Sequence, residues 1–549
     1  MFPREGEQPL RNRNDRLQNK TFREDESVDV EKKYLDGSRY DETVTGSCTL
    51  PLAYPAKSMS SWRIRRKVKT QDIILALCLN FDQIPEDSFY EGKMGDECWI
   101  HTKSLSQKKS AYRYIALTLQ KQYENQLRSS AGIRTKHLLD PSLGNVETAC
   151  EEIRASGDKA SQNRVIFHYN GHGVPIPSDL GEIWVFNKRY DKYKPLPISL
   201  IHSWIKTPTL YVMDCSHAGE LLNHLLELNT DNMEDETEDV YFLGACDTME
   251  LLPSHPSFPA DLFTACLTDP LRISIHWYLY MRHLQAFNLT QDIVDEDTIE
   301  EDFAYRLEGS FHDRSSPRGK LRMIFDCITD CIAWNQCDVE TYKRIFKTDE
   351  MVANLFRNFL LAQRILSFFN CHPVSKPCFP DMSDHHLWKT WDAVVEEFLH
   401  QLYQSQASRK GLDVISRDVE LVTAAPAASD GVEETHDPYA HIRRVPAAGA
   451  SANVLATTVR SAFSFHTSFF RSALQELYSF ARLSPQMNEI PESFPMLAQL
   501  LSSDEMTQQV SPSDSINAIE LFADFAERSV DAVMAILTSI NFASLKRIS

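Results

Sequence analysis

The stretch RVIFHYNGHG, residues 164–173, joins an apolar run to a Gly-His-Gly turn. Three further stretches are similarly apolar: QDIILALCLNF at 71–81, TLYVMDC at 209–215 and VYFLGAC at 240–246. Between the runs, the spacing of apolar residues predicts helices at 105–127 and 146–156. Short apolar runs that alternate with helices indicate a parallel sheet covered on both faces. The sequence therefore predicts an α/β domain over 62–290, after a polar, disordered tail over 1–61.

The strand signal disappears after residue 290, and helices are predicted for the rest of the chain. They are expected at 319–335, 340–347, 349–369, 385–405, 462–483, 492–502 and 514–541. Helices that pack only on helices form a bundle or an α-solenoid. We expect a helical junction with the first solenoid helices over 291–405, and further solenoid helices over 462–549. Residues 406–461, rich in Ala, Pro, Gly and Ser, are predicted to be a disordered insertion.

Composition excludes several classes of function for this chain of 549 residues. The formal net charge is −20, so no global field attracts nucleic acid or anionic lipid. Its 12 cysteines lack a paired framework, which indicates a reducing compartment. The first 20 residues contain no signal-peptide core, and no run approaches the roughly 18 apolar residues of a membrane helix. We expect a soluble, cytoplasmic protein that does not insert into membranes.

Two strand ends carry side chains that are typical of nucleophilic catalysis. His172 follows the run that ends at Tyr169, and the Cys215–Ser216 pair follows the run that ends at Asp214. If the two strands are neighbours, about 4.8 Å apart, both groups lie at one edge of the sheet, where a nucleophile and its base belong. A helix is predicted to start directly afterwards, and its amino end would lower the pKa of a thiol. A structural role for each residue is the alternative.

Metal binding is not predicted from the same segment. His168 and His172 are four residues apart, but in a strand-to-loop context they do not share a helix face, and no carboxylate or thiol completes a zinc set. A helix carries Cys327, Cys331 and Cys337, for which core packing is the better interpretation. We therefore expect no metal and no cofactor.

Long, ordered segments of the chain resemble the amino-terminal caspase-like domain of the Raptor family, scaffold subunits of TOR complex 1. The resemblance covers about 62–400 and resumes weakly at 465–545. It is carried by WRIRRKVKT (62–70), LQKQYEN (119–125), VIFHYNGHGVP (165–175), GEIWVFNKRYDKYKPLPI (181–198), TPTLYVMDCSHAG (207–219), PADLFT (259–264), IFDCITDCIAWN (324–335) and LFRNFLLAQRILSFFNCHPVSKP (355–377). The resemblance implies a caspase-like domain, an armadillo or HEAT-type α-solenoid and a carboxyl-terminal WD-repeat propeller. The propeller has no counterpart before Ser549, so we expect a truncated product or a partial gene model.

The resemblance also implies that the strand ends are vestigial. Active metacaspase relatives carry Asp-Cys-Cys-His-Ser-Gly, and DCSHAG places Ser216 at the nucleophile position, with Cys215 one residue early. A serine beside a lone histidine, without a third orienting group, is a poor nucleophile. We therefore expect a pseudo-protease with a vestigial dyad of His172 and Ser216. The alternative is an active peptidase of the caspase and metacaspase clan that uses His172 and Cys215.

By the same resemblance, the chain is expected to be a non-catalytic adaptor that recruits substrates to the TOR kinase in response to nutrients. Raptor proteins capture a TOR-signalling motif, a Phe followed by alternating acidic and aliphatic residues, where the caspase-like domain meets the solenoid. At that junction FHDRSSPRGKLRMIF (311–325) is basic within an acidic chain, and we expect Arg314 to pair with the acids, helped by Arg318 and Lys320. The resemblance further implies small GTPases as partners of the solenoid, and recruitment to the lysosome or vacuole surface through partners.

Overall fold

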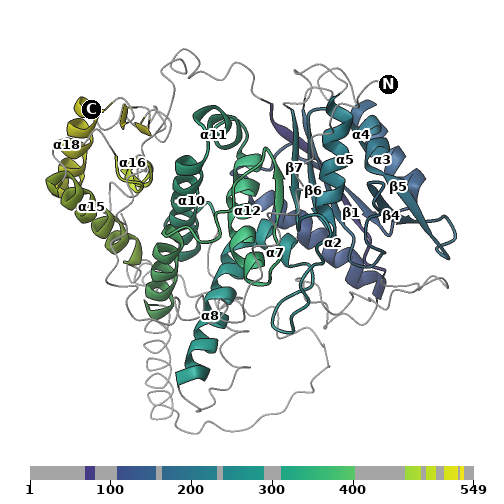
Figure 1. Ribbon diagram of the computed structural model, residues 1–549, viewed down its shortest axis with the longest axis horizontal. Helices are drawn as coiled ribbons and strands as arrows, with labels where there is room; N and C mark the ends of the chain where they lie inside the picture. The colour runs from purple at the N-terminus through teal and green to yellow at the C-terminus, as the bar shows by residue number, and fades with distance from the viewer. Residues whose placement is uncertain are drawn as a thin grey trace, which may run out of the picture.

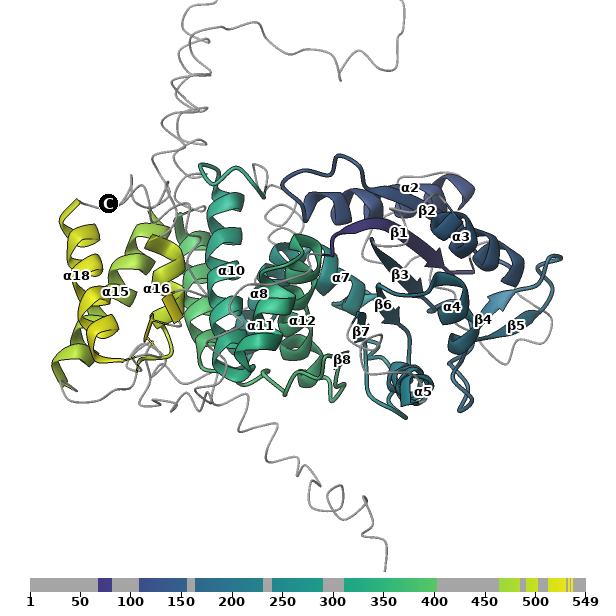
Figure 2. The ribbon, with the colours of Figure 1, turned by 90° about the horizontal axis from the view of Figure 1, so that it is seen from above.

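The computed structural model describes residues 68–80, 108–155, 163–230, 239–289, 311–401, 464–483, 490–501 and 512–529, with short pieces at 532–533 and 535–536. The predicted tail over 1–61 and the predicted insertion over 406–461 lie outside the described residues. The described elements form three blocks in a row, with the sheet at one end, the helices within 270–368 in the middle block, and the helices within 465–528 in the C-terminal block at the other end (Figures 1 and 2).

A mostly parallel sheet of six strands forms the first block, in the order β2-β1-β3-β6-β7-β8. Its strands are β1 (Thr70–Leu77), β2 (Arg134–Leu139), β3 (Arg164–Asn170), β6 (Thr209–Asp214), β7 (Val240–Gly244) and β8 (Val374–Lys376). The apolar runs form the buried central strands, and every residue of β3, β6 and β7 is buried. Strands β3 and β6 are parallel neighbours, which is the condition under which both strand ends lie at one edge, with Asn170 opposite Asp214 at the last register position. The carboxyl ends of the two strands therefore meet at one edge.

Helices cover both faces of this sheet (Figure 1). On one face lie α3 (Leu143–Ala155), α4 (Ile198–Ile205) and α5 (Ala218–Thr230), which contact one another in chain order. On the other lie α2 (Lys108–Asn125), α7 (Leu262–Thr268) and α12 (Glu350–Phe368), of which α7 contacts both others. The prediction of an α/β caspase-like fold followed by a helical region is confirmed.

Three pieces of strand structure were not predicted from the sequence. The edge strand β2 is half exposed and has no apolar run, and β8 has only three residues. The third piece is an antiparallel hairpin of β4 (Glu182–Phe186) and β5 (Tyr193–Pro197), outside the main sheet. Because β8 pairs antiparallel with β7, chain from well beyond residue 290 completes the sheet. The domain boundary at 290 stays a prediction, and the sheet itself crosses it.

The helical region follows the predicted helices, except that the helix over Pro270–Leu289 was not predicted from the sequence. It contains α8 (Pro270–Leu289), α10 (Pro317–Gln336), α11 (Val339–Phe346), α12, a helix over 387–401, α15 (Phe465–Leu483), α16 (Phe494–Leu501) and α18 (Pro512–Arg528). Polar side chains define three of the helix starts: Ser316 accepts a hydrogen bond from Gly319 N, and Asp338 and Asp349 cap α11 and α12 in the same way. The C-terminal block packs onto the middle block through contacts of α10 with α15 and α16. An armadillo or HEAT-type solenoid stays a prediction.

Candidate functional site

The Gly-His-Gly turn holds His172 directly beyond the end of β3. Gly171 N donates to Asp214 O over 3.0 Å, and Gly173 N donates to Cys78 O over 2.8 Å, so the turn is tied to β6 and to the chain after β1. A Cβ on Gly173 would lie 2.3 Å from the carbonyl carbon of Leu79. Only glycine permits this close approach of two backbones. The turn therefore places His172 at a fixed position on the sheet edge.

The partner of His172 is Asp214, the last residue of β6. His172 Nε2 lies 2.8 Å from Asp214 Oδ1, with the histidine side chain 9% exposed and the aspartate fully buried. Burial alone would raise the pKa of Asp214, but His172 and the hydrogen bonds from His172 and Thr264 outweigh it and lower the pKa below its ordinary value. An ionised carboxylate only accepts hydrogen bonds, so His172 Nε2 is the donor. The expectation of a histidine without an orienting group was wrong.

A second buried histidine extends this contact into a network. Thr264, in the first turns of α7, donates both its backbone N–H (3.0 Å) and its hydroxyl to Asp214 Oδ2. The Thr264 oxygen also lies 3.4 Å from His168 Nε2, and Tyr123 OH lies 2.8 Å from His168 Nδ1. Burial lowers the pKa of His168 to about 4, so its ring is neutral. Since the Thr264 proton goes to Asp214, Nε2–H of His168 donates to Thr264 and Nδ1 accepts from Tyr123.

The Cys215 thiol is placed for packing and is poorly suited to attack. The residue is 3% exposed and belongs to the core beneath the sheet edge. Burial, followed by the neighbouring Cys246 and Asp214, raises the pKa of Cys215 well above its ordinary value. A thiolate is the reactive form of cysteine, and this environment opposes it. The expected lowering of this pKa by the amino end of a helix was wrong, because desolvation dominates.

Ser216 and His217 form the bend between β6 and α5. Ser216 Oγ accepts a hydrogen bond of 3.0 Å from Leu252 N, and His217 N donates to Glu250 O over 2.9 Å. His217 adopts a positive φ of 56°, which allows α5 to start at Ala218. The Ser216 hydroxyl and the backbone N–H of His217 therefore both bind the loop after β7. In this conformation they fix that loop to the sheet edge.

Sequence reasoning missed Asp214, Thr264 and His168 as members of the site. Asp214 was visible as the polar residue that ends a fully apolar run, which is a signal for a buried functional or structural carboxylate. Thr264 lies about 50 residues later in the chain, and only the packing of α7 on the sheet brings it to Asp214. No local pattern reports that contact.

The predicted basic residues lie on the segment that enters α10. Arg314 is half-buried in the loop before the helix. The guanidinium of Arg318 lies 4.0 Å over the ring of Phe311 and 3.5 Å from Asp269 Oδ1. Lys320 is only 4% exposed, and burial lowers its pKa. Of the three predicted residues, Arg314 and Arg318 are partly exposed, whereas Lys320 is buried.

A single short helix connects the two candidate sites. Thr264 in α7 binds Asp214 at the sheet edge, and Asp269, the residue that follows α7, faces Arg318. A helix of this length spans about 10 Å at 1.5 Å per residue. The sheet edge and the basic segment are therefore separate sites, and α7 contacts the first through Thr264 and the second through Asp269.

Comparisons with known proteins agree with this architecture. Residues 68–225 match the family model described as the Raptor N-terminal CASPase like domain. The "Regulatory-associated protein of TOR 1" of Arabidopsis thaliana is 42% identical over 347 residues, which are 62% of this chain and 24% of that protein. The "Target of rapamycin complex 1 subunit mip1" of Schizosaccharomyces pombe is 38% identical over 368 residues, 64% of this chain and 26% of that protein.

A solved structure extends the likeness over the helical region. The crystal structure of Chaetomium thermophilum Raptor superposes with a TM-score of 0.63 at 29% identity, covering 93% of this chain and 39% of that one. The chain spans about a quarter of the length of the curated relatives it matches. Residues 68–225 are therefore a Raptor N-terminal caspase-like domain, and the homologues of this chain are Raptor proteins and TOR complex 1 subunits.

Proposed function

We propose that this chain is a non-catalytic adaptor subunit of TOR complex 1 that recruits substrates to the TOR kinase. The observation that carries the assembly is the homology to proteins named as TOR regulators and TOR complex 1 subunits. The described residues add a buried sheet edge that is held by hydrogen bonds, and a basic segment at the junction with the helices. Both are features of a rigid binding scaffold. Within such a complex, the adaptor supplies the substrate contact and the kinase supplies the chemistry.

The absence of proteolysis is part of this proposal, and the burial of Cys215 supports it. A nucleophile must be reached by a peptide, whereas Cys215 is 3% exposed and its pKa is raised. Ser216, at the nucleophile position by alignment, uses its hydroxyl oxygen to hold Leu252. The competing peptidase would use His172 and Cys215, and it would require this edge to open.

A cysteine-directed electrophile tests the catalytic question on the intact chain. Peptide mapping after labelling is expected to find the exposed Cys378 modified and Cys215 unmodified, because one thiol reaches solvent and the other does not. Cys378 thus serves as the internal control for the reagent. Modification of Cys215 in the native protein that disappears in His172→Ala would establish the peptidase instead.

For substrate recruitment, we propose that Arg314 pairs with the acidic residues of a TOR-signalling motif. The loop that carries Arg314 lies between Phe311 and the start of α10, beside the guanidinium of Arg318. A peptide with a leading Phe and alternating acids needs an apolar surface and a basic group, and this segment offers both. Lys320 is buried, so its contribution is limited to the local positive potential.

Charge reversal tests this peptide site. Arg314→Glu is expected to weaken binding of a TOR-signalling peptide more than tenfold, or about 1.4 kcal/mol, in a calorimetric titration. Arg189→Glu, on the exposed turn of the β4–β5 hairpin, is the matched control and should leave the affinity unchanged. Equal affinities for the two variants would remove Arg314 from the site.

Association with the kinase is tested by co-purification. The chain, expressed with an affinity tag in cells that contain a TOR kinase, is expected to retain the kinase after washing. We further propose that it acts in the cytoplasm, that small GTPases contact its helical region, and that such partners recruit it to the lysosome or vacuole surface. No described helix is long and apolar enough to cross a bilayer. Loss of the kinase from every purification would reject the adaptor role.

A further inference from the structure

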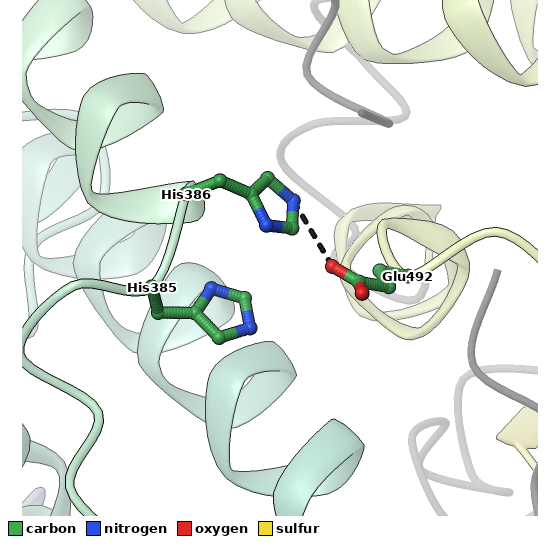
Figure 3. A group of neighbouring side chains, drawn as sticks. All are labelled: His385, His386 and Glu492. Carbon is green, nitrogen blue, oxygen red and sulfur yellow. Dashed lines mark ion pairs between the residues drawn. The ribbon is translucent and has the colours of Figure 1, made fainter. Parts of the chain in front are cut away.

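Two histidines and a glutamate meet where the middle helices contact the C-terminal block (Figure 3). His385 and His386 precede the helix over 387–401, and Glu492 precedes α16. His386 Nε2 lies 3.0 Å from Glu492 Oε2, and the two imidazole rings stack with centroids 4.7 Å apart. One ligand-type atom from each residue lies within 4.8 Å of the others. Among the described residues, this is the one group of three potential metal ligands.

Glu492 is in an unusual position for a carboxylate. It is 5% exposed, and its buried Oε2 accepts no hydrogen bond from any described residue. Its backbone carbonyl is well bound, by Cys331 Sγ at 2.7 Å and Asn335 Nδ2 at 3.2 Å, so the residue is held in place from behind. The Oε2 atom thus faces the histidines without a hydrogen-bond donor, a position that a bound cation would satisfy.

The donor set selects the class of cation. Two imidazoles and one carboxylate are borderline and hard ligands that suit Zn²⁺, and the same set occurs in three-residue zinc sites with water at the fourth position. Ca²⁺ and Mg²⁺ prefer six or more oxygen ligands, which this group does not offer.

The geometry is close to that of a bound ion and requires one adjustment. Ligand atoms about 2.0–2.1 Å from a tetrahedral ion are about 3.4 Å apart. The contact between His386 and Glu492 is near this value, and the remaining separations of up to 4.8 Å close by a shift of no more than about 1.5 Å through side-chain torsions. His385 Nδ1 now accepts a 3.2 Å hydrogen bond from Leu387 N, and binding would exchange this long bond for the metal.

We propose that His385, His386 and Glu492 bind one zinc-class divalent cation, with water as the fourth ligand. The ion links the start of the helix over 387–401 to the segment that enters α16. It neutralises a buried carboxylate at the contact between two blocks that are more than 100 residues apart in the chain. Metal binding therefore stabilises the docking of the C-terminal helices onto the middle helices.

The full chain, freed of metal with a chelator, is titrated with Zn²⁺ by calorimetry, and the retained metal is counted after dialysis. Co²⁺ provides a second readout, because a tetrahedral site gives strong visible absorption. We expect one ion per chain whose affinity falls at least tenfold in His386→Ala, His385→Ala and Glu492→Gln. Zn²⁺ should raise the melting temperature of the wild type and leave that of the variants unchanged, and Mg²⁺ should have no effect.

A matched control is provided by His372 and Glu250, a histidine and carboxylate in contact at 2.7 Å without a second histidine. His372→Ala should bind Zn²⁺ as the wild type does. Glu492→Gln keeps the shape of the side chain, so its circular dichroism should match the wild type. The proposal is rejected if the wild type retains no Zn²⁺ and gives no tetrahedral Co²⁺ spectrum, or if Glu492→Gln and His386→Ala bind Zn²⁺ with unchanged affinity.

Discussion

His172 with Asp214 and His386 with Glu492 are the same chemical pair in two different surroundings. In both, a histidine Nε2 approaches a carboxylate that is 5% exposed or less, at 2.8 Å and 3.0 Å. The pKa of Asp214 is nevertheless lowered, whereas burial raises the pKa of Glu492 to about 7. At Asp214 the charge and hydrogen bond of His172, together with the hydrogen bonds from Thr264, outweigh burial, whereas burial acts alone on Glu492 and its Oε2 accepts no hydrogen bond from the described residues.

The two sites differ in whether the described residues supply hydrogen-bond donors to the buried carboxylate oxygens. At the sheet edge both carboxylate oxygens of Asp214 accept hydrogen bonds from protein groups. At the helix contact the buried Oε2 of Glu492 has no hydrogen-bond donor among the described residues. Residue type and burial are therefore insufficient to assign the charge state of a buried carboxylate. The neighbouring charge and the hydrogen-bond donors that contact its oxygens also decide it.

Replacing each carboxylate by its amide should give the largest effect. Asp214→Asn removes the charge that binds His172 and Thr264, and we expect it to reduce the free energy of unfolding by roughly 3–5 kcal/mol. Glu492→Gln in metal-free protein should cost less than about 1 kcal/mol, because it replaces an uncompensated buried acid. Urea titrations measure both. Asp179→Asn, on the exposed loop before β4, is the control and should change little. Equal losses at Asp214 and Glu492 would contradict the comparison.

Removing the Thr264 hydroxyl, one of the donors to Asp214, should raise the pKa of Asp214 toward that of a buried carboxylate with fewer donors, such as Glu492. Thr264→Val deletes the hydroxyl bond to Oδ2, at a cost of about 1–2 kcal/mol. Because the folded pKa of Asp214 is lowered, its contribution to stability is present above its unfolded pKa and is lost as the pH falls through the folded pKa. The variant should therefore unfold at a higher pH in an acid titration followed by circular dichroism. Thr467→Val, whose hydroxyl binds a carbonyl within its own helix start, should leave the acid midpoint unchanged.

The smallest effect is expected at the more exposed pair of His372 and Glu250. His372 Nδ1 lies 2.7 Å from Glu250, with the histidine side chain 52% exposed, so His372→Gln should cost under about 1 kcal/mol. The hydrogen bond to Glu250 raises the pKa of His372. Burial would raise the pKa of Glu250, but hydrogen bonds from the side chain and backbone of His372 and from Asp247 N lower it overall.

The pH dependence of this pair follows from the raised pKa of His372 and the lowered pKa of Glu250. The His372 contribution is complete below its unfolded pKa of about 6.5 and is lost as the pH rises through the folded value, and the Glu250 contribution is lost as the pH falls through its own lowered value. Wild type and His372→Gln should therefore differ in melting temperature near pH 5.5 and converge near pH 8.5. A difference that grows with pH would show that the contact stabilises the fold by packing alone.

The sequence itself determined the main elements of the fold. Continuous apolar runs predicted β1, β3, β6 and β7, because central parallel strands are buried on both faces and cannot carry polar side chains. Helical periodicity predicted α10, α11 and α12 to within a few residues. Strand-end positions predicted that His172 and Cys215 lie at one edge, since neighbouring parallel strands end together. Strands β2 and β8 lacked such a signal because one lies half exposed at the sheet edge and the other is very short.

The tertiary structure alone decided the chemistry of these positions. Whether Cys215 is a nucleophile or a core residue depends on its burial beside Cys246, and whether His172 is alone depends on the packing that brings α7 and Thr264 to Asp214. The meeting of His385 and His386 with Glu492 depends on the docking of α16 against α10. Periodicity along a chain reports which face of an element is buried. The pKa and partners of a side chain are set by groups that are distant in sequence, and only the packed fold brings these together.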